Sequence, residues 1–174
     1  MAIRAPAVAR CYRRAMAEAR PAILDDDQRA FLAAARTATL ATISPSGRPR
    51  LVPICFVVGE DAPGGRPRIH SPLDEKPKRS DDPRDLARVQ DLLVLPEATL
   101  LVDRWSEDWD RLAWLRLDCS GELLEPEPRE RDEHAAAIVA LRAKYPQYEG
   151  HRLEARPVIR FTVQRALSWG DLRA

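Results

Sequence analysis

A short basic run is the feature of this sequence that points most directly to chemistry. Lys76, Lys78 and Arg79 lie within four residues, although the chain has only three lysines and otherwise uses arginine as its cation. A lysine ammonium suits a phosphate oxygen, and the helix expected to begin near Pro83 adds partial positive charge at its N-terminus. The run therefore predicts a phosphate site. The alternative is a solvated loop, because four acids flank the run: Asp74, Glu75, Asp81 and Asp82.

A cluster of tryptophans is the second such feature. Trp105, Trp109 and Trp114 are three of the four tryptophans and fall within ten residues. Indole rings can stack on a planar heterocycle, but they also fill barrel cores and interfaces, and this second use is the more common one. Alternation along the expected strand puts Trp114 on the face opposite Leu115. We therefore expect Trp114 to point away from the core, toward a dimer surface or a cleft.

The common catalytic signatures are absent from the sequence. It has no Gly-rich phosphate loop, no GxSxG and no HExxH, and its histidines, His70, His134 and His151, lack ligand spacing. We interpret His70 as a buried barrel residue and the other two as solvated. The three cysteines show neither CxxC nor CxxH spacing, which excludes a zinc motif and a disulfide framework and fits a reducing cytoplasm. No catalytic residue and no metal site are predicted.

The elements that must position these residues are mainly strands. Expected strands cover 38–43, 51–58, 68–71, 98–103, 112–119, 121–125 and 158–163, and expected helices cover 25–36, 83–95 and 129–144. Because the helices interrupt antiparallel strands instead of alternating with them, the pattern predicts a mainly β fold with flanking helices (α+β), a small β-barrel. Segment 51–58 is apolar on both faces, which predicts cover on both sides, one of them a ligand or a partner subunit.

Composition limits the possible partners. The 174 residues carry 28 Lys and Arg against 27 Asp and Glu, a formal net charge of +1, so neither nucleic acid nor a membrane is an expected partner. Residues 1–24 hold five arginines and one acid but no apolar export signal. We expect 1–24 to be a basic appendage and 25–174 to form one domain.

Five segments in a fixed order carry a family resemblance. They are FLAAARTATLAT (31–42), SGRPRLVP (46–53), IHSPLDEKPKR (69–79), residues 100–116 and KYPQY (144–148). The series resembles the split-barrel flavin and deazaflavin oxidoreductases, which are relatives of pyridoxamine 5′-phosphate oxidase. Within them it is most similar to the branch that uses coenzyme F420, a deazaflavin that carries hydride. The resemblance covers about residues 28–170.

The resemblance implies a homodimer of FMN-binding-like split β-barrels, with two cofactor sites in grooves between the subunits. Pro53, Ile54 and Cys55 match the strand segment that lies along the tricyclic ring of the cofactor. His70 and Ser71 match strand positions that touch the ring edge or the phosphate arm.

The basic run and the tryptophans also have counterparts in the family. Lys76 and Lys78, with Arg79 nearby, match basic residues that hold the cofactor phosphate. Trp109 and Trp114 match aromatic positions near the ring, contributed by the partner subunit. Because the cofactor carries the hydride, the resemblance requires no catalytic acid or base from the protein.

The chain departs from the F420-dependent branch at two places. Gln90 and Asp91 stand where an Arg-Asn pair is common, and Cys119 stands where a glycine is common. An acid in place of a cation argues against an acidic polyglutamylated tail on that side. The pyridoxal-type substrate pocket is not matched, so pyridoxamine phosphate oxidation is not expected.

The sequence therefore predicts a cytoplasmic, homodimeric oxidoreductase that uses F420 to transfer hydride to an unidentified small organic substrate, planar and conjugated. One alternative is an FMN-dependent oxidoreductase. Another is a flavin- or haem-binding module without turnover.

Overall fold

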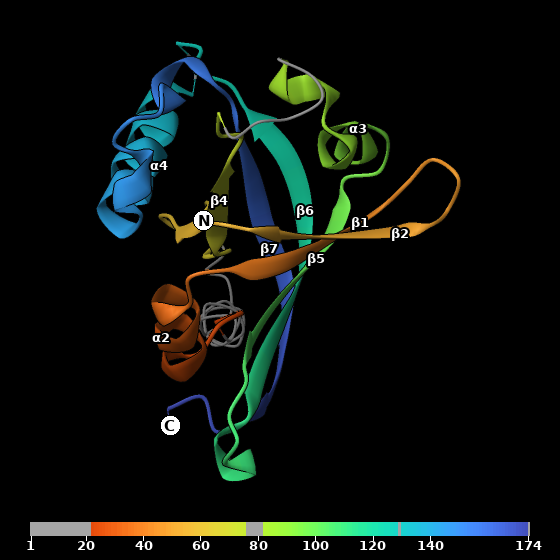
Figure 1. Ribbon diagram of the computed structural model, residues 1–174, viewed down its shortest axis with the longest axis vertical. Coiled ribbons are helices and arrows are strands. Elements are labelled where there is room, and N and C mark those ends of the chain that lie inside the picture. Colours follow the sequence, from red (N-terminus) through yellow and green to blue (C-terminus); the bar gives the residue numbers. More distant parts are fainter. Residues whose placement is uncertain (1–21, 76–81, 129, 174) are drawn as a thin grey trace, which may run out of the picture.

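A curled antiparallel sheet forms the centre of the molecule, in a computed structural model that describes residues 22–75, 82–128 and 130–173 (Figure 1). Its seven strands are ordered β2-β1-β5-β6-β7-β4-β3. The strands are β1 (Ala38–Ile43), β2 (Pro49–Ile54), β3 (Val57–Val58), β4 (Arg68–Pro72), β5 (Glu97–Arg104), β6 (Ala113–Leu124) and β7 (Val158–Gly170). Three α-helices flank the sheet within these ranges: α2 (Asp26–Ala34), α3 (Ala87–Val94) and α4 (Arg131–Lys144). The predicted fold class, mainly β with flanking helices, is confirmed.

Local sequence signals set the first helix and the first hairpin. Asp25 caps α2 by accepting a hydrogen bond from the backbone N–H of Gln28. The side chain of Gln28 in turn accepts a hydrogen bond from the Asp25 N–H. The turn between β1 and β2 closes with a hydrogen bond from the Gly47 N–H to the Ser44 carbonyl, and Gly47 adopts a φ of 79°. A positive φ favours glycine, so this residue fits the turn that the sequence predicted.

The expected strand 51–58 is wrong as a single element. β2 ends at Ile54 and β3 covers only Val57–Val58, and the chain bends at Cys55 and Phe56. There the Phe56 N–H donates to the Tyr145 hydroxyl, at 3.0 Å, and not to a neighbouring strand. The expectation of a separate strand after residue 119 is also wrong, since β6 runs unbroken and only its register with β7 shifts at Asp118/Cys119.

Two apolar cores hold the elements. The main core fills the inside of the curl, between the sheet and helices α2 and α3, and it includes Leu24, just before the first helix. A second, smaller core lies between α4 and strands β3 and β7. Helix α4 buries His134, Ala137, Ile138 and Leu141, at the i, i+3, i+4, i+7 spacing of one helix face.

The prediction that His134 is solvated is therefore wrong. Its ring is buried on the packed face of α4, and Nε2 lies 2.8 Å from the carbonyl oxygen of Arg156. Among the residues that the structure describes, none of the helices has the length and apolar character needed to cross a membrane.

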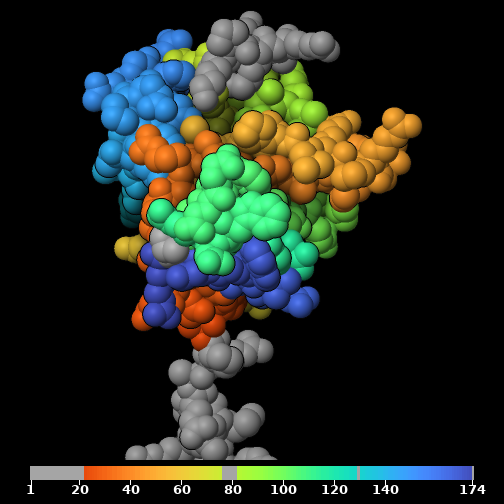
Figure 2. Space-filling model, turned by 60° about the horizontal axis from the view of Figure 1, so that its bottom comes forward, coloured from red at the N-terminus to blue at the C-terminus, as the bar shows by residue number. Residues whose placement is uncertain are grey.

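The two ends of the sheet differ in how much they are covered. Helix α4 covers one end, whereas at the other end the β5–β6 connection stands out from the surface, in bright green in Figure 2. This connection carries the predicted tryptophan cluster.

Candidate functional site

The end of β2 and the start of the basic run lie together, although they are about twenty residues apart in sequence. The contact between them is made by Tyr148, which is 1% exposed and donates a hydrogen bond of 3.3 Å to the Asp74 carboxylate. Burial raises the pKa of Tyr148, and so do the neighbouring Cys55 and Asp74. The side chains of Cys55, Asp74 and Tyr148 therefore share one buried environment.

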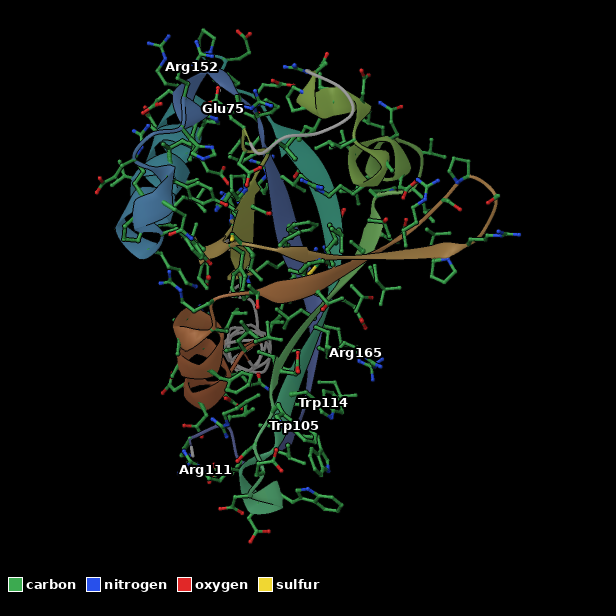
Figure 3. All side chains as sticks on the ribbon, in the orientation of Figure 1. Glu75, Trp105, Arg111, Trp114, Arg152 and Arg165 are labelled. Atoms are coloured by element: carbon green, nitrogen blue, oxygen red, sulfur yellow. The ribbon has the colours of Figure 1, made fainter. Side chains whose placement is uncertain are left out.

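The segment that leads into the basic run is fixed by three hydrogen bonds. Arg156 Nε donates to the Leu73 carbonyl at 2.6 Å, and the Glu75 N–H donates to His151 Nδ1 at 3.1 Å. The backbone N–H of Arg152 donates to the Glu75 carboxylate at 3.1 Å. Figure 3 shows Glu75 and Arg152 together at the end of the molecule that α4 covers.

The predicted phosphate-binding residues continue directly from this fixed point. Lys76, Lys78 and Arg79 lie outside the residues that the structure describes. Their sequence neighbours Asp74 and Glu75 nevertheless tie the start of the run to the end of β2.

Arg88 is a candidate that the sequence interpretation missed. It lies in the first turn of α3, and the charges of Asp74 and Tyr148 act on it. Its Nε is buried without a hydrogen-bond partner among the described residues, and burial lowers the pKa of the guanidinium. An unsatisfied buried donor costs about 1–3 kcal/mol, so an anion that accepts from Arg88 would be stabilised here. The sequence alone gave no signal, because Arg88 is one of many arginines.

Lys144 adds a second cation beside the bend at the end of β2. Its ammonium lies 4.3 Å from the centroid of the Phe56 ring, one residue after Cys55. Burial and the nearby Arg36 lower the pKa of Lys144 to about 8. An ammonium with this pKa can exchange a proton close to neutral pH.

The three residues expected to lie along the cofactor ring, at the end of β2 and just after it, face different ways. Pro53 is exposed and pairs with Thr39 on the outer face of the sheet, whereas Ile54 is buried in the main core. Cys55 is half-buried at the bend. A ligand that lies along this segment would contact Pro53 and Cys55 by their side chains and Ile54 only by its backbone.

His70 and Ser71 are both buried, but they lie on opposite faces of β4, as alternation along a strand requires. The His70 ring faces α4, where its Nε2 lies 2.8 Å from the Glu133 carboxylate. One ligand on one face of β4 can thus touch only one of these two side chains. The interpretation of His70 as a buried barrel residue agrees with this position.

The tryptophans lie far from the rest of the site within one chain. Trp109 is 74% exposed, and Trp114 is half-buried between Asp103 and Trp169 in the sheet register. Trp114 and Trp105 occupy the end of the molecule opposite Glu75 (Figure 3). Leu115 is fully buried in the main core, so the predicted outward direction of Trp114 is confirmed.

The acid at position 91 does not face a ligand. Asp91 has no exposed surface and accepts hydrogen bonds of 2.8 Å from the Thr42 hydroxyl and from Arg50. Arg50 neutralises its charge, and the two hydrogen bonds connect α3 to the first hairpin. The expectation that Asp91 would oppose an acidic cofactor tail therefore loses its basis.

Cys119 is a packing residue. It is buried in the main core, and burial raises the pKa of its thiol to about 12. A thiol in this state is not a nucleophile near neutral pH.

A seven-stranded antiparallel half-barrel with helices against its open ends is the split-barrel class of fold. Residues 24–170 match the family model described as Pyridoxamine 5'-phosphate oxidase, and the chain belongs to this family.

Solved structures share the fold at low sequence identity. A conserved hypothetical protein from Mycobacterium tuberculosis is 21% identical, with a TM-score of 0.62 over 90% of this chain and 91% of that chain. A FAD-binding protein from Mesorhizobium loti is 16% identical, with a TM-score of 0.60 over 83% and 94% of the two chains. The haem storage protein HutZ from Vibrio cholerae is 13% identical, with a TM-score of 0.57 over 84% and 94%. No functionally curated protein matches the sequence.

Proposed function

We propose that this protein is a dimeric oxidoreductase that binds the deazaflavin F420 and uses it to transfer hydride to a small organic substrate. The observation that carries the proposal is Arg88. Its Nε is a buried N–H donor without an acceptor among the described residues, beside Asp74 and therefore beside the start of the basic run. A cofactor phosphate would supply the missing acceptor.

The described residues fit a phosphate-bearing tricyclic cofactor. The bend at Cys55 and the start of the basic run are tied together through Tyr148 and Asp74, so a ring and its phosphate arm could be held by neighbouring segments. When bound, the cofactor supplies the hydride chemistry, and the chain supplies binding and orientation. In this assignment Arg88, Lys76 and Lys78 bind the phosphate, and Lys144 lies near the ring as a group that can hold a proton.

A second copy of the chain would complete the site. The outer face of β5, β6 and β7 exposes apolar side chains in adjacent register positions, among them Leu101 (37% exposed) and Leu167 (41%), on either side of Arg116. Trp169, beside Trp114, is 54% exposed. Exposed apolar side chains gathered on one face of a sheet favour a protein interface. A partner docked there could bring its tryptophans to the ring.

FMN is the alternative cofactor, and a haem- or flavin-binding module without turnover is the alternative function. Family membership and the fold shared with a FAD-binding protein support a flavin-type ligand. A haem storage protein shares the fold, so haem is the alternative ligand.

The test is a titration of the purified protein with F420, FMN and haem, followed by absorbance and fluorescence. We expect F420 to bind most tightly, and we expect Lys76→Ala, Lys78→Ala and Arg88→Gln each to weaken binding by roughly ten- to a hundredfold. Added salt should weaken binding further. Arg48→Gln, in the exposed β1–β2 turn, is the matched control and should bind as the wild type does.

Turnover separates the enzyme from the binding module. Oxidation of reduced F420 in the presence of conjugated organic acceptors would support the oxidoreductase. A Soret band with no F420 binding would instead support a haem-binding function. If all three variants bind F420 as the wild type does, the phosphate site lies elsewhere.

A further inference from the structure

A cavity of about 580 Å³ lies between the β3–β4 hairpin and α4, on the side of β4 that faces away from the main core. Its volume is in the range of small-molecule sites. Its lining includes His70 but none of the other residues assigned to the cofactor. Apart from His70, its lining is therefore distinct from the segments assigned to the cofactor.

Small residues keep the cavity open. Ala136 and Ala140 lie one turn apart on α4 and, with Val57 and Val58, give the cavity an apolar wall. Gly59 lies against the edge of the His70 ring, where an added Cβ would be 2.5 Å from Cε1 and 2.7 Å from Nδ1. Any larger residue at position 59 would displace the histidine.

His70 offers an acceptor to a ligand in this cavity. Its side chain is 2% exposed, and Nε2 donates to the Glu133 carboxylate at 2.8 Å. Burial lowers the pKa of His70, so its ring is neutral near pH 7 and Nδ1 carries a lone pair. Nδ1 is buried and has no hydrogen-bond partner among the described residues. A ligand N–H directed at Nδ1 would satisfy it.

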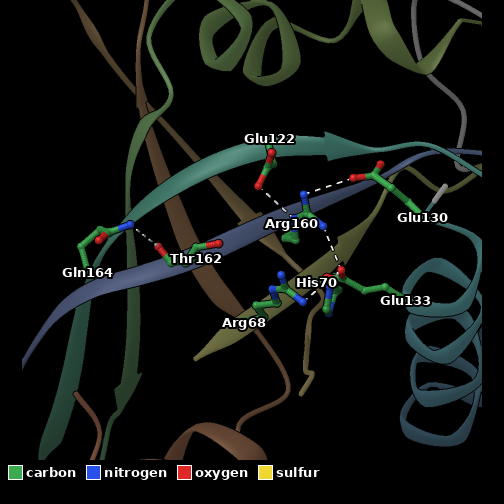
Figure 4. Close-up of polar contacts among 8 residues, drawn as sticks. All are labelled: Arg68, His70, Glu122, Glu130, Glu133, Arg160, Thr162 and Gln164. Carbon is green, nitrogen blue, oxygen red and sulfur yellow. Dashed lines mark hydrogen bonds and ion pairs between the residues drawn. The ribbon is translucent and has the colours of Figure 1, made fainter. Parts of the chain in front are cut away.

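The charge around the cavity is negative. Five carboxylates lie in its lining or beside it: Glu60, Glu122, Glu130, Asp132 and Glu133. Two guanidinium groups oppose them, and Figure 4 shows both turned toward Glu133. Arg160 contacts the Glu133 carboxylate at 2.8 Å and Arg68 contacts it at 3.1 Å.

The carboxylates of the cavity mouth are not part of this network. Glu60 and Asp132 line the cavity, and neither forms an ion pair within the described part of the chain. An anion would meet uncompensated like charge at this mouth, whereas a cation would find two carboxylates there.

We propose that this cavity binds a small organic cation, a primary amine on an apolar or aromatic body. The ammonium group lies between Glu60 and Asp132 and donates toward His70 Nδ1, and the apolar body packs on Val57, Ala136 and Ala140. This inference goes beyond the proposed function, because the cavity attracts the charge opposite to that of a phosphate-bearing cofactor.

The experiment titrates the full-length protein with phenethylamine, and in parallel with phenylethanol and phenylacetate, by calorimetry and by the chemical shifts of the histidine ring protons. We expect saturable binding of the amine, at least tenfold weaker binding of the alcohol, and no binding of the carboxylate. The His70 ring resonances should shift with the amine alone. The same titration in the presence of saturating F420 should give an unchanged affinity for the amine.

Variants assign the binding to this cavity. Ala136→Trp fills the cavity and should abolish amine binding, whereas Ala135→Trp, at the next and exposed position outside the lining, should not. The double change Glu60→Gln with Asp132→Asn should weaken the binding of the amine by about tenfold, as the loss of two partly exposed charge contacts predicts. Glu107→Gln, in the remote β5–β6 connection, is the charge control.

Two results would overturn the proposal. One is equal binding of the amine, the alcohol and the carboxylate, which would remove the charge argument. The other is amine binding that survives Ala136→Trp with an unchanged thermal midpoint, which would place the amine elsewhere. Both outcomes are independent of whether F420 binds.

Discussion

The two ends of the sheet treat aromatic side chains in opposite ways. At the end covered by α4, Tyr145 and Tyr148 are buried, and both hydroxyls have partners within the chain. At the other end, Trp105 and Trp109 are exposed, although tryptophan has more apolar surface to bury. One end of the molecule is thus packed within a single chain, whereas the other leaves aromatic surface exposed, where we propose that a second copy docks.

The difference follows from what each segment can reach. The Tyr145 hydroxyl lies 2.8 Å from the carbonyl oxygens of Arg36 and Phe56, so one side chain joins three segments that are distant in sequence. The β5–β6 connection extends beyond the helices (Figures 1 and 2), and its Trp105 and Trp109 are 71% and 74% exposed. Stability of the fold should therefore depend on the first end and association on the second.

The largest effect is expected from Tyr145→Ala. Truncating this buried ring should lower the free energy of unfolding by about 3–5 kcal/mol, as for other large aromatic residues in cores. Tyr145→Phe should cost about 1–3 kcal/mol, because it leaves the Phe56 N–H without its acceptor. Urea unfolding measures both. Val139→Ala, on the exposed side of α4, should change stability by less than about 0.5 kcal/mol, and an equal loss there would contradict the comparison.

The next largest effect concerns association at the other end. Leu101→Asp with Leu167→Asp places two charges in the outer face of β5 and β7, and the dimer dissociation constant should rise by at least about a hundredfold, or 2.7 kcal/mol. Sedimentation at micromolar concentration should change from about twice 19.6 kDa to one chain. Val139→Asp, which puts the same charge on exposed α4, should leave the dimer intact. A wild-type protein that sediments as a monomer would refute this interpretation of the tryptophan end.

The smallest effect is a pH dependence confined to the covered end. Burial holds the pKa of His70 below its usual 6.5, so the unfolded chain binds more protons than the folded one as the pH falls below about 6.5. The contribution of His70 to stability should therefore decline on acidification, by up to about 1.4 kcal/mol for each pH unit below 6.5, and should be constant above it. Glu133, whose pKa is lowered by His70, Arg160 and Arg68 against the effect of burial, adds a further loss only below about pH 4.5.

Unfolding by urea at pH 7.5 and pH 5.5 tests this dependence. His70→Asn should remove most of the loss between the two pH values, and Glu107→Gln at the tryptophan end should not. If the wild type and His70→Asn lose the same stability, the dependence arises from another group.

Sequence signals that act over a few residues were sufficient to predict much of the fold. The cap at Asp25, the turn at Gly47 and the alternation of Trp114 with Leu115 each depend on backbone geometry within four residues, and the structure agrees with each. The resemblance in the ordered segments was sufficient for the family and the split-barrel fold. It also predicted that the segment 53–55 and the basic run bind the cofactor.

The errors have a common physical cause, which is a partner distant in sequence. A β pattern over 51–58 is locally reasonable, but the Phe56 N–H bonds to Tyr145, 89 residues away, and not to a strand. His134 looked solvated because neighbouring positions on α4 are polar, yet the helix face that contains it packs on the sheet. Leu24 was assigned to the appendage and lies in the main core.

The sequence by itself determined the strand-rich fold and the placement of its caps and turns, and it suggested the residue types of the proposed phosphate site, because these depend on local propensity and on ordered motifs. Only the tertiary structure decided which charges have partners. It paired Asp91 with Arg50, left the Arg88 Nε without an acceptor in the part of the chain that the structure describes, and placed His70 and Ser71 on opposite faces of β4. Pairing and burial depend on contacts between segments that the chain order leaves far apart, and these contacts set the cost of every buried charge.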